Sequence, residues 1–263
     1  MLTISVDSSN NIWAGTLGLD ILKYDKKEDN WKIQKIVRDD TTKQPLTEST
    51  VLGMTADGKG HIWAGSFISG LIRYDDEIQG FRKVEFANPD EAPDFSQTDN
   101  AITYLFTDVT GILWFTTRNG IYKYNPATKL IKTIKEYTTN KSSFFNYFNC
   151  ITEDLEGNIW ITNHQRGILK FEGISDEYKE IKLAGQHFNR EHISDLILTY
   201  MLVDKTGILW FGTTGDGLLK YDPKTAPFRL YQHDPENPQS LSSNHIFSLF
   251  ESKVHPGKIY VGT

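Results

Sequence analysis

A tryptophan-centred segment recurs along the chain at a nearly constant interval. Its clearest copy is Asp204–Thr213, which reads Asp-Lys-Thr-Gly-Ile-Leu-Trp-Phe-Gly-Thr. Successive copies are about 50 residues apart, and a fixed period of that length indicates a repeat architecture. The last copy carries tyrosine where the others carry tryptophan. The central aromatic residues are Trp13, Trp63, Trp114, Trp160, Trp210 and Tyr260.

The third repeat shows how one copy is expected to fold. Asp108–Gly111 is typical of a tight turn, because aspartate accepts bonds from nearby backbone amides and glycine supplies a positive φ. Arg118–Gly120 contains an Asn-Gly pair, which favours a short hairpin loop. The segments between these turns are rich in β-branched and aromatic residues and predict strands. The four predicted strands are 101–107, 112–117, 121–125 and 129–136.

Each repeat therefore predicts a four-stranded antiparallel meander, and no helical period of useful length occurs. A four-stranded sheet repeated at this interval indicates an all-β fold, the β-propeller, whose blades pack face to face. We expect a single propeller over 1–263 with five complete blades and a half blade. Because an unclosed ring would expose a blade face at each end, we also expect a fragment of a longer protein or a covering chain. The predicted blades are 1–38, 51–87, 101–137, 149–183, 198–232 and, in part, 245–263.

The charge and composition argue against some kinds of binding partner and some structural features. The formal net charge is −6, which argues against nucleic-acid binding by this region, since such binding needs a basic face. A single cysteine, Cys150, rules out a disulfide within the chain. No apolar run has the length of a transmembrane helix. The first residues alternate like a strand and do not resemble a signal peptide.

Three motifs together resemble the two-component regulator propeller repeat. They are Asp204–Thr213, then Gly-Leu-Leu-Lys-Tyr-Asp-Pro at 217–223, then the Asp-Pro-Glu-Asn-Pro-Gln-Ser-Leu-Ser-Ser-Asn-His-Ile segment at 234–246. The resemblance covers essentially the whole chain. It implies a seven-bladed ring in the periplasmic sensor region of a hybrid histidine kinase that regulates polysaccharide utilisation. It further implies an oligosaccharide ligand, a dimer, and membrane contact only through downstream segments.

Most recurring residues have a structural interpretation. An aromatic residue at one fixed position of every blade is expected to pack between blades, because buried aromatics dominate core energetics. The recurring Asp-x-x-Gly lacks the dense set of oxygen ligands that calcium needs, and turn chemistry explains it. The Lys-Tyr-Asp sequences at the ends of the third strands are likewise expected to be structural. No metal site or cofactor is predicted.

Ligand binding is expected where the repeats differ, in the loops between second and third strands and in the crossovers between blades. Arginine, histidine, asparagine and aromatic side chains are a mixture that suits polyhydroxylated or anionic sugars. Arg118 and the segment His164-Gln165-Arg166 are the leading candidates, since they occupy corresponding loops of adjacent blades. Phe67, Phe148, His187 and Arg190 also fall in this set. The candidate ligand-binding residues are Arg118, Asn119, Tyr147, His164, Gln165, Arg166, His192 and Asp216.

The sequence shows no catalytic residues. There is no nucleophile elbow, no His/Cys cluster with metal-ligand spacing and no phosphate-binding loop. We therefore expect a non-enzymatic sensing region. Two alternatives remain open: a propeller lyase of the kind that opens streptogramin antibiotics, and a protein-interaction scaffold without a small ligand. A lyase would place a histidine and a carboxylate on a metal in the central channel.

Overall fold

The computed structural model divides into two compact units, Met1–Ser142 and Ser143–Thr263, and each is described by itself. Strands dominate both units, and the described residues contain no α-helix, only two short 3-10 turns. None of the described segments is a helix with the length and apolar character needed to cross a bilayer. The described residues are 3–18, 21–37, 50–67, 69–136, 148–163, 167–173, 175–181, 196–225, 228–255 and 257–263.

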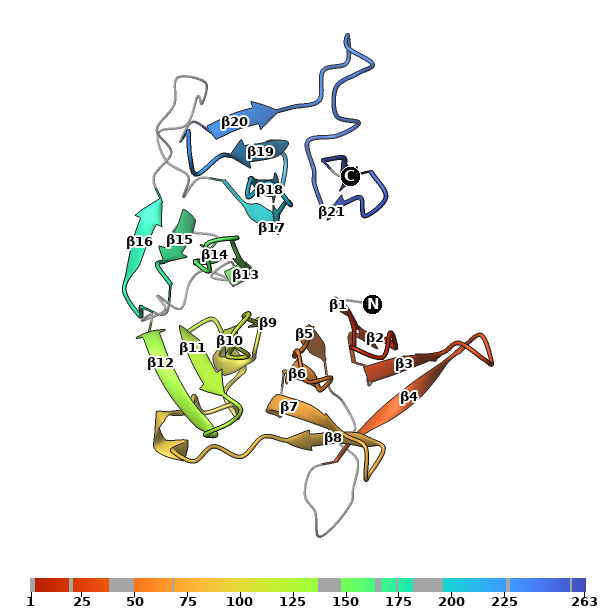
Figure 1. Cartoon of the computed structure of the whole chain (residues 1–263), viewed down its shortest axis with the longest axis vertical. Coiled ribbons are helices and arrows are strands. Elements are labelled where there is room, and N and C mark those ends of the chain that lie inside the picture. The colour runs from red at the N-terminus through yellow and green to blue at the C-terminus, as the bar shows by residue number, and fades with distance from the viewer. Residues whose placement is uncertain are drawn as a thin grey trace. The chain divides into compact units, whose positions relative to one another are not determined.

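The first unit contains the strands of repeats 1 to 3 (Figure 1). The sheet of repeat 3 is a four-stranded antiparallel meander, as the sequence predicts, although its first strand begins three residues later than expected. The strands of this unit are β1 (Thr3–Val6), β2 (Ile12–Gly15), β3 (Ile21–Asp25), β4 (Asn30–Val37), β5 (Val51–Ala56), β6 (Ile62–Ser66), β7 (Gly70–Asp75), β8 (Gly80–Lys83), β9 (Tyr104–Thr107), β10 (Leu113–Thr116), β11 (Gly120–Asn125) and β12 (Leu130–Glu136). The 3-10 turns η1 (Pro89–Glu91) and η2 (Thr98–Asn100) lie in the crossover between repeats 2 and 3.

Repeats 1 and 2 are joined into one eight-stranded sheet, which the sequence does not predict. The outermost strands β4 and β8 pair in parallel over Lys35–Val37, so the strand order is β1-β2-β3-β4-β8-β7-β6-β5. Gly80 permits this approach, because a Cβ there would lie 2.8 Å from the carbonyl oxygen of Lys35. Ile36 is buried at the junction. Two predicted blades are therefore tied together by main-chain hydrogen bonds at their outer strands.

The Asn88 side chain pairs with the outer edge of the repeat 3 sheet, at strand β12. Asn88, just before η1, accepts a hydrogen bond from the Ile131 N–H (2.9 Å) and donates one to the Ile131 carbonyl (2.7 Å). The neighbouring Ala87 N–H donates to the Lys129 carbonyl. An asparagine thus continues the sheet beyond β12 for one residue, as a strand would.

The second unit contains the strands of repeats 4 to 6. Two four-stranded antiparallel sheets follow the predicted meander, and repeat 6 contributes a two-stranded sheet. The strands are β13 (Phe148–Glu153), β14 (Ile159–Asn163), β15 (Gly167–Phe171), β16 (Tyr178–Ile181), β17 (Leu198–Val203), β18 (Leu209–Thr213), β19 (Leu218–Tyr221), β20 (Phe228–Tyr231), β21 (Ser248–Glu251) and β22 (Ile259–Gly262).

The recurring Asp-x-x-Gly segment is a turn closed by its aspartate. In repeat 2, Asp57 Oδ1 accepts the backbone N–H groups of Lys59 and His61, and Gly60 adopts a φ of +92°. The other carboxylate oxygen accepts the indole N–H of Trp63 at 3.0 Å. This indole bond recurs in four further repeats at 2.7–2.9 Å: Asp7 with Trp13, Asp108 with Trp114, Asp154 with Trp160, and Asp204 with Trp210. The turn was predicted, but the indole bond was not.

Tryptophan rings pack between repeats. Trp13 meets Tyr74 with ring centroids 4.6 Å apart, and each ring belongs to a different repeat. Trp63 with Tyr124 (5.8 Å) and Trp160 with Tyr221 (5.7 Å) repeat this contact. The predicted packing role is therefore confirmed for these rings, and so is the structural role of the tyrosines. A basic residue of the third strand also lies over each tryptophan: Lys23, Arg73, Lys123, Lys170 and Lys220.

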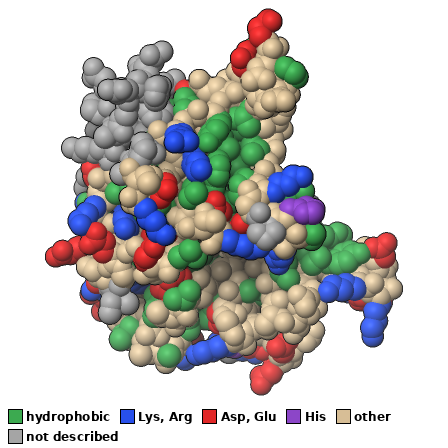
Figure 2. Space-filling model, turned by 45° about the horizontal axis from the view of Figure 1, so that its top comes forward, with side chains coloured by type: hydrophobic (Ala, Val, Ile, Leu, Met, Phe, Trp, Pro, Cys, Tyr) green, Lys and Arg blue, Asp and Glu red, His purple; other side chains and the backbone are tan. Residues whose placement is uncertain are grey.

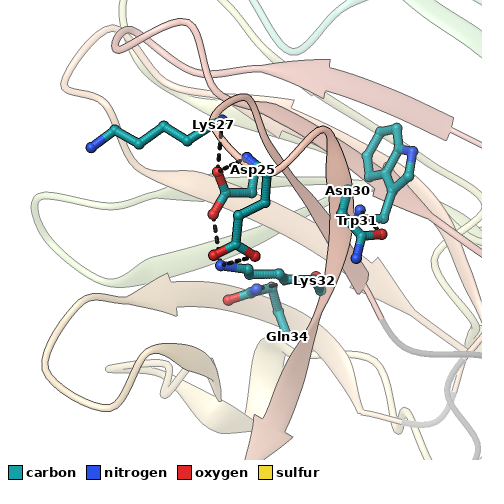
Figure 3. A network of polar contacts seen from close by, with 7 residues as sticks. Asp25, Lys27, Asn30, Trp31, Lys32 and Gln34 are labelled. Carbon is teal, nitrogen blue, oxygen red and sulfur yellow. Dashed lines mark hydrogen bonds and ion pairs between the residues drawn. The ribbon is translucent and has the colours of Figure 1, made fainter.

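The hairpin between third and fourth strands is also built on a recurring acid (Figure 3). Asp25 accepts the Lys27 backbone N–H at 2.9 Å and pairs with Lys32 Nζ at 2.7 Å. The hydrogen bond with Lys32 is the largest of the effects that lower the pKa of Asp25 to about 2. The same acid–base spacing recurs in Asp75 with Arg82 and in Glu172 with Lys179. These ion pairs join the two strands of the hairpin, and they account for the recurring acid and base without a ligand.

Candidate ligand-binding loops

The loops that follow the tryptophan strands carry the described candidate residues. In the first unit these loops follow β2, β6 and β10, and in the second unit one follows β18. Figure 2 shows acidic, basic and apolar side chains intermixed on the face in view, without a dominant charge sign.

Arg118 and Asn119 are bound to the crossover that precedes their own repeat. Arg118 Nη1 pairs with Asp99 Oδ1 at 3.0 Å, and its backbone N–H donates to the Asp99 carbonyl. Asn119 Nδ2 donates to Asn100 Oδ1 at 2.9 Å. The Arg118 side chain is only 25% exposed. These contacts hold the crossover against the hairpin, and the guanidinium is fixed in position.

The hairpin turn itself differs from the expected Asn-Gly type. Neither Asn119 nor Gly120 has a positive φ, which a type I′ turn would require at both central residues. Instead, Thr117 Oγ1 accepts the N–H groups of Asn119 and Gly120, both at 3.1 Å. A buried threonine hydroxyl thus shapes this loop, because it satisfies two backbone donors that the short loop leaves unpaired.

An apolar pair lies on neighbouring loops of repeats 1 and 2. Thr50 joins the two loops: its hydroxyl accepts the Gly18 N–H at 3.2 Å and its carbonyl accepts the Phe67 N–H at 2.9 Å. Leu17, next to Gly18, is 69% exposed, and Phe67 is 37% exposed. Phe67 belongs to the predicted set, and its exposure makes the ring accessible for stacking. Leu17 was missed, since a lone leucine carries no polar signal.

In the second unit, Asp216 lies in the loop between β18 and β19. Its backbone N–H donates to Thr213 Oγ1 at 3.0 Å, and its carbonyl accepts a bond from Gln232 Nε2. The flanking Gly215 and Gly217 both donate their N–H groups to the Asn244 carbonyl. The loop is therefore rigidly held by the segment that leads into repeat 6.

His245 lies beside the same loop and was not predicted. Its backbone bridges to Thr214, and a Cβ built on Gly215 would lie 3.7 Å from the His245 ring carbon Cε1. The side chain is exposed. The signal that could have found it is its place directly after Asn244 in the Ser-Leu-Ser-Ser-Asn-His motif, at the mouth of the loop that carries Asp216.

The other predicted site residues lie outside the described residues. These are Tyr147, His164, Gln165, Arg166 and His192, together with His187 and Arg190. Phe148 begins β13, but only its backbone is described. Within the described ranges, no group of three or more histidine, cysteine, aspartate or glutamate side chains is arranged to hold a metal ion.

Several proteins of known structure share the fold of this chain. The extracellular domain of the putative hybrid two-component system BT4673 from B. thetaiotaomicron matches 100% of this chain with a TM-score of 0.73 and 21% identity. PorZ, a surface component of the type-IX secretion system of Porphyromonas gingivalis, matches 99% with the same TM-score and 18% identity. The chain spans 31% and 37% of those two chains. The resemblance drawn from the sequence is thus confirmed at the level of fold.

A lyase shares the architecture at a greater distance. Virginiamycin B lyase from Staphylococcus aureus matches 88% of this chain and 70% of its own, with a TM-score of 0.61 and 16% identity. These neighbours are β-propeller proteins, which confirms the all-β fold of four-stranded sheets. The number of blades stays a prediction. No protein-family model and no curated protein matches the chain.

Proposed function

We propose that this chain is a ligand-sensing, non-catalytic part of the extracytoplasmic region of a hybrid two-component sensor. The observation that carries the proposal is the match of the whole chain to the extracellular domain of such a system. The repeat motifs at 204–213, 217–223 and 234–246 point to the same class. In this proposal the chain belongs to a seven-bladed ring within a longer, periplasm-facing protein that forms a dimer.

The proposed ligand is an oligosaccharide. Support comes from the loops: an exposed phenylalanine, Phe67, can stack on the apolar face of a sugar ring, and the fixed guanidinium of Arg118 offers donors in a planar fork. Considered by itself, the second unit also offers polar groups in the loop of Asp216, where the backbone of the neighbouring His245 bridges to Thr214. A sensor needs such a ligand to bind two arrangements of the protein with different affinities.

Calorimetric titration with a panel of polysaccharides and oligosaccharides tests the proposal. We expect one glycan class to bind saturably to the protein with its ring complete. Replacement of Phe67 by Ala should weaken that binding at least about tenfold if the ring stacks on the sugar. Leu130→Ala is the matched control, since Leu130 is an exposed apolar residue on the outer strand β12. The absence of binding by every glycan would overturn the sensing proposal in favour of a scaffold.

The lyase alternative has its own discriminating measurement. The match to virginiamycin B lyase favours it as the second candidate. Incubation with a streptogramin and Mg²⁺, followed by mass spectrometry, would show ring opening as a change in the antibiotic. We expect the antibiotic to remain intact. Metal-dependent ring opening would replace the sensor assignment with an enzymatic one.

A further inference from the structure

The crossover between repeats 2 and 3 packs against both candidate loops of these repeats, within the first unit. Gly70 directly follows the loop that carries Phe67, and a Cβ on Gly70 would lie 2.5 Å from the Phe95 ring of the crossover. Phe95 is 7% exposed, so it anchors the crossover in the core. At the other end, Asn100 accepts a hydrogen bond at 2.9 Å from Asn119, in the loop after β10. A ligand that contacts both loops therefore lies against this crossover.

The crossover is acidic. Residues 84–103, between β8 and β9, contain five acids and no lysine or arginine, so a ligand beside them meets a negative potential. The exposed Asp94 accepts bonds from the side chains of Ser96 (2.7 Å) and Gln97 (3.0 Å), which lower its pKa and keep it ionised at neutral pH. Lys83, the last residue of β8, offsets only part of this charge. The five acids are Glu85, Asp90, Glu91, Asp94 and Asp99.

Asp99 pairs with the base that would recognise an anionic sugar. Arg118 Nη1 lies 3.0 Å from Asp99 Oδ1, and the Arg118 backbone N–H donates to the Asp99 carbonyl. A guanidinium binds the carboxylate or sulfate of a ligand through the same kind of bond that it makes with an aspartate. The anionic group of a ligand would therefore have to displace Asp99, which the backbone bond holds in place. The loops after β2 and β6, residues 16–20 and 67–69, contain no lysine or arginine.

We infer that the loops of repeats 2 and 3 bind an uncharged oligosaccharide in preference to a carboxylated or sulfated one, and that Asp99 determines this preference. The inference rests on the proposed sensing function and narrows its class of ligand. An uncharged sugar ring can stack on the exposed Phe67 without an ion pair. An acidic sugar in the same place meets the like charge of the crossover, which opposes its binding.

Calorimetric titration at neutral pH tests the charge preference, with the protein whose ring is complete. The probes are oligosaccharides of galacturonic acid, of glucuronoxylan and of alginate, each as the free acid and as its methyl ester, which is uncharged and similar in size. We expect every ester that binds to do so at least about tenfold more tightly than its free acid. Because salt screens charge, the difference should shrink at about 0.5 M NaCl. A free acid that binds as tightly as its ester, or more tightly, would overturn the inference.

The variant Asp99→Asn tests the role of the aspartate. It removes the carboxylate that pairs with Arg118, so we expect the free acid to gain at least about fivefold in affinity relative to the ester. Asp90→Asn is the matched control, since it removes the same charge from the same crossover and keeps the pair between Asp99 and Arg118. Equal gains in the two variants would show that Asp99 does not determine the preference.

A cysteine probe measures the potential at the crossover without any glycan. Thr98→Cys places a thiol at an exposed position next to Asp99, and the parent chain gives the background rate, because its single cysteine, Cys150, is buried. The thiol is treated with methanethiosulfonate reagents that carry either a sulfonate or a trimethylammonium group. Relative to the cationic reagent, the sulfonate should react several-fold more slowly than it does with N-acetylcysteinamide.

Equal rate ratios for the protein and N-acetylcysteinamide would overturn the inference, because the crossover would then not repel anions. A slowed sulfonate reagent, combined with no binding of any glycan, would contradict the sensing proposal and leave the repulsion of anions established. The two failures are therefore distinguishable.

Discussion

Trp63 donates its indole N–H to Asp57 across 3.0 Å, and the same carboxylate closes the turn that precedes the tryptophan strand. A single acid therefore fixes both a backbone turn and the orientation of the ring that packs against Tyr124 in the next repeat. Local turn chemistry and packing between repeats depend on one side chain, and this coupling makes the aspartate a sensitive position.

Replacement of Asp57 by asparagine is expected to destabilise the first unit by about 2 kcal/mol, because a hydrogen bond to a charged group contributes roughly 1.5–3 kcal/mol. Asparagine can still accept the turn amides, but its NH₂ group cannot accept the indole N–H. Urea unfolding measures the change. The exposed Asp90→Asn is the control and should shift the midpoint little. Equal midpoints for the two variants would show that the indole bond contributes nothing.

The pKa shifts of the turn aspartates predict a loss of stability in acid. Burial opposes ionisation of Asp57 and Asp204, but bonds from indole, side-chain and backbone donors outweigh it and lower the pKa of each. A carboxyl whose folded pKa is depressed contributes stability above its unfolded pKa of about 3.9 and loses it as pH falls through the folded value. Asp25, whose pKa is lowered to about 2, likewise contributes stability that is lost as the pH falls.

The expected result is a stability that is constant above about pH 5 and falls steadily below about pH 4. Urea unfolding at a series of pH values, followed by circular dichroism, provides the measurement. Asp57→Asn should flatten the acid limb. An unchanged slope in that variant would assign the acid sensitivity to other carboxyl groups.

The parallel pairing of β4 with β8 should depend on Gly80. A valine there would force its Cβ against the Lys35 carbonyl, at 2.8 Å in the present geometry, and so separate the two strands. Hydrogen exchange should then accelerate at the amides that join β4 and β8, while the sheets of repeats 1 and 2 remain protected. Gly58→Ala is the matched control, since a Cβ at Gly58 meets nothing within 4 Å. Unaltered exchange in Gly80→Val would mean that the pairing tolerates a side chain.

Arg118→Ala is expected to loosen the crossover before repeat 3 without unfolding the sheet. It removes the pair with Asp99, while the backbone bond from residue 118 to the Asp99 carbonyl remains. Limited proteolysis should cleave near η2 several-fold faster than in the parent chain. Lys59→Ala, in an exposed turn, serves as the control. Equal cleavage rates would show that the ion pair does not hold the crossover, as is common for exposed pairs.

The repeat period and the alternation of apolar residues were enough to predict the meander, the turn at each Asp-x-x-Gly and the packing of the tryptophans. These features depend on residues that are close in sequence, so the same residue pattern predicts them in each repeat. The indole bond was missed because sequence shows that Asp57 and Trp63 share a frame but not that two side chains meet. The pairing of β4 with β8 was missed because it joins strands from different repeats, and Gly80 alone gave no reason to expect it.

The positions of the candidate residues in the fold were predictable only in part, and their role in binding stays a prediction. The Arg118 loop was placed correctly between second and third strands, yet its contacts with Asp99 and Asn100 are long-range and carry no sequence signature. Leu17 and His245 were not among the predicted residues, because their places beside these loops depend on which segments meet at Thr50 and Gly215. Phe67 was predicted from its place in a loop where the repeats differ, and its role in binding stays a prediction.

The short span of the aspartate–tryptophan bond also affects the order in which the chain can fold. Only six positions separate the partners in each copy, so this contact can close as soon as a single turn and strand have left the ribosome. The β4–β8 pairing joins strands a whole repeat apart and must wait for the second copy to be synthesised. Contacts of low sequence separation form fast, and distant pairings form slowly. During synthesis, the repeats would therefore fold in order from the N-terminus. Each repeat would form its own aspartate–tryptophan bond before the next repeat is present to pair or pack with it.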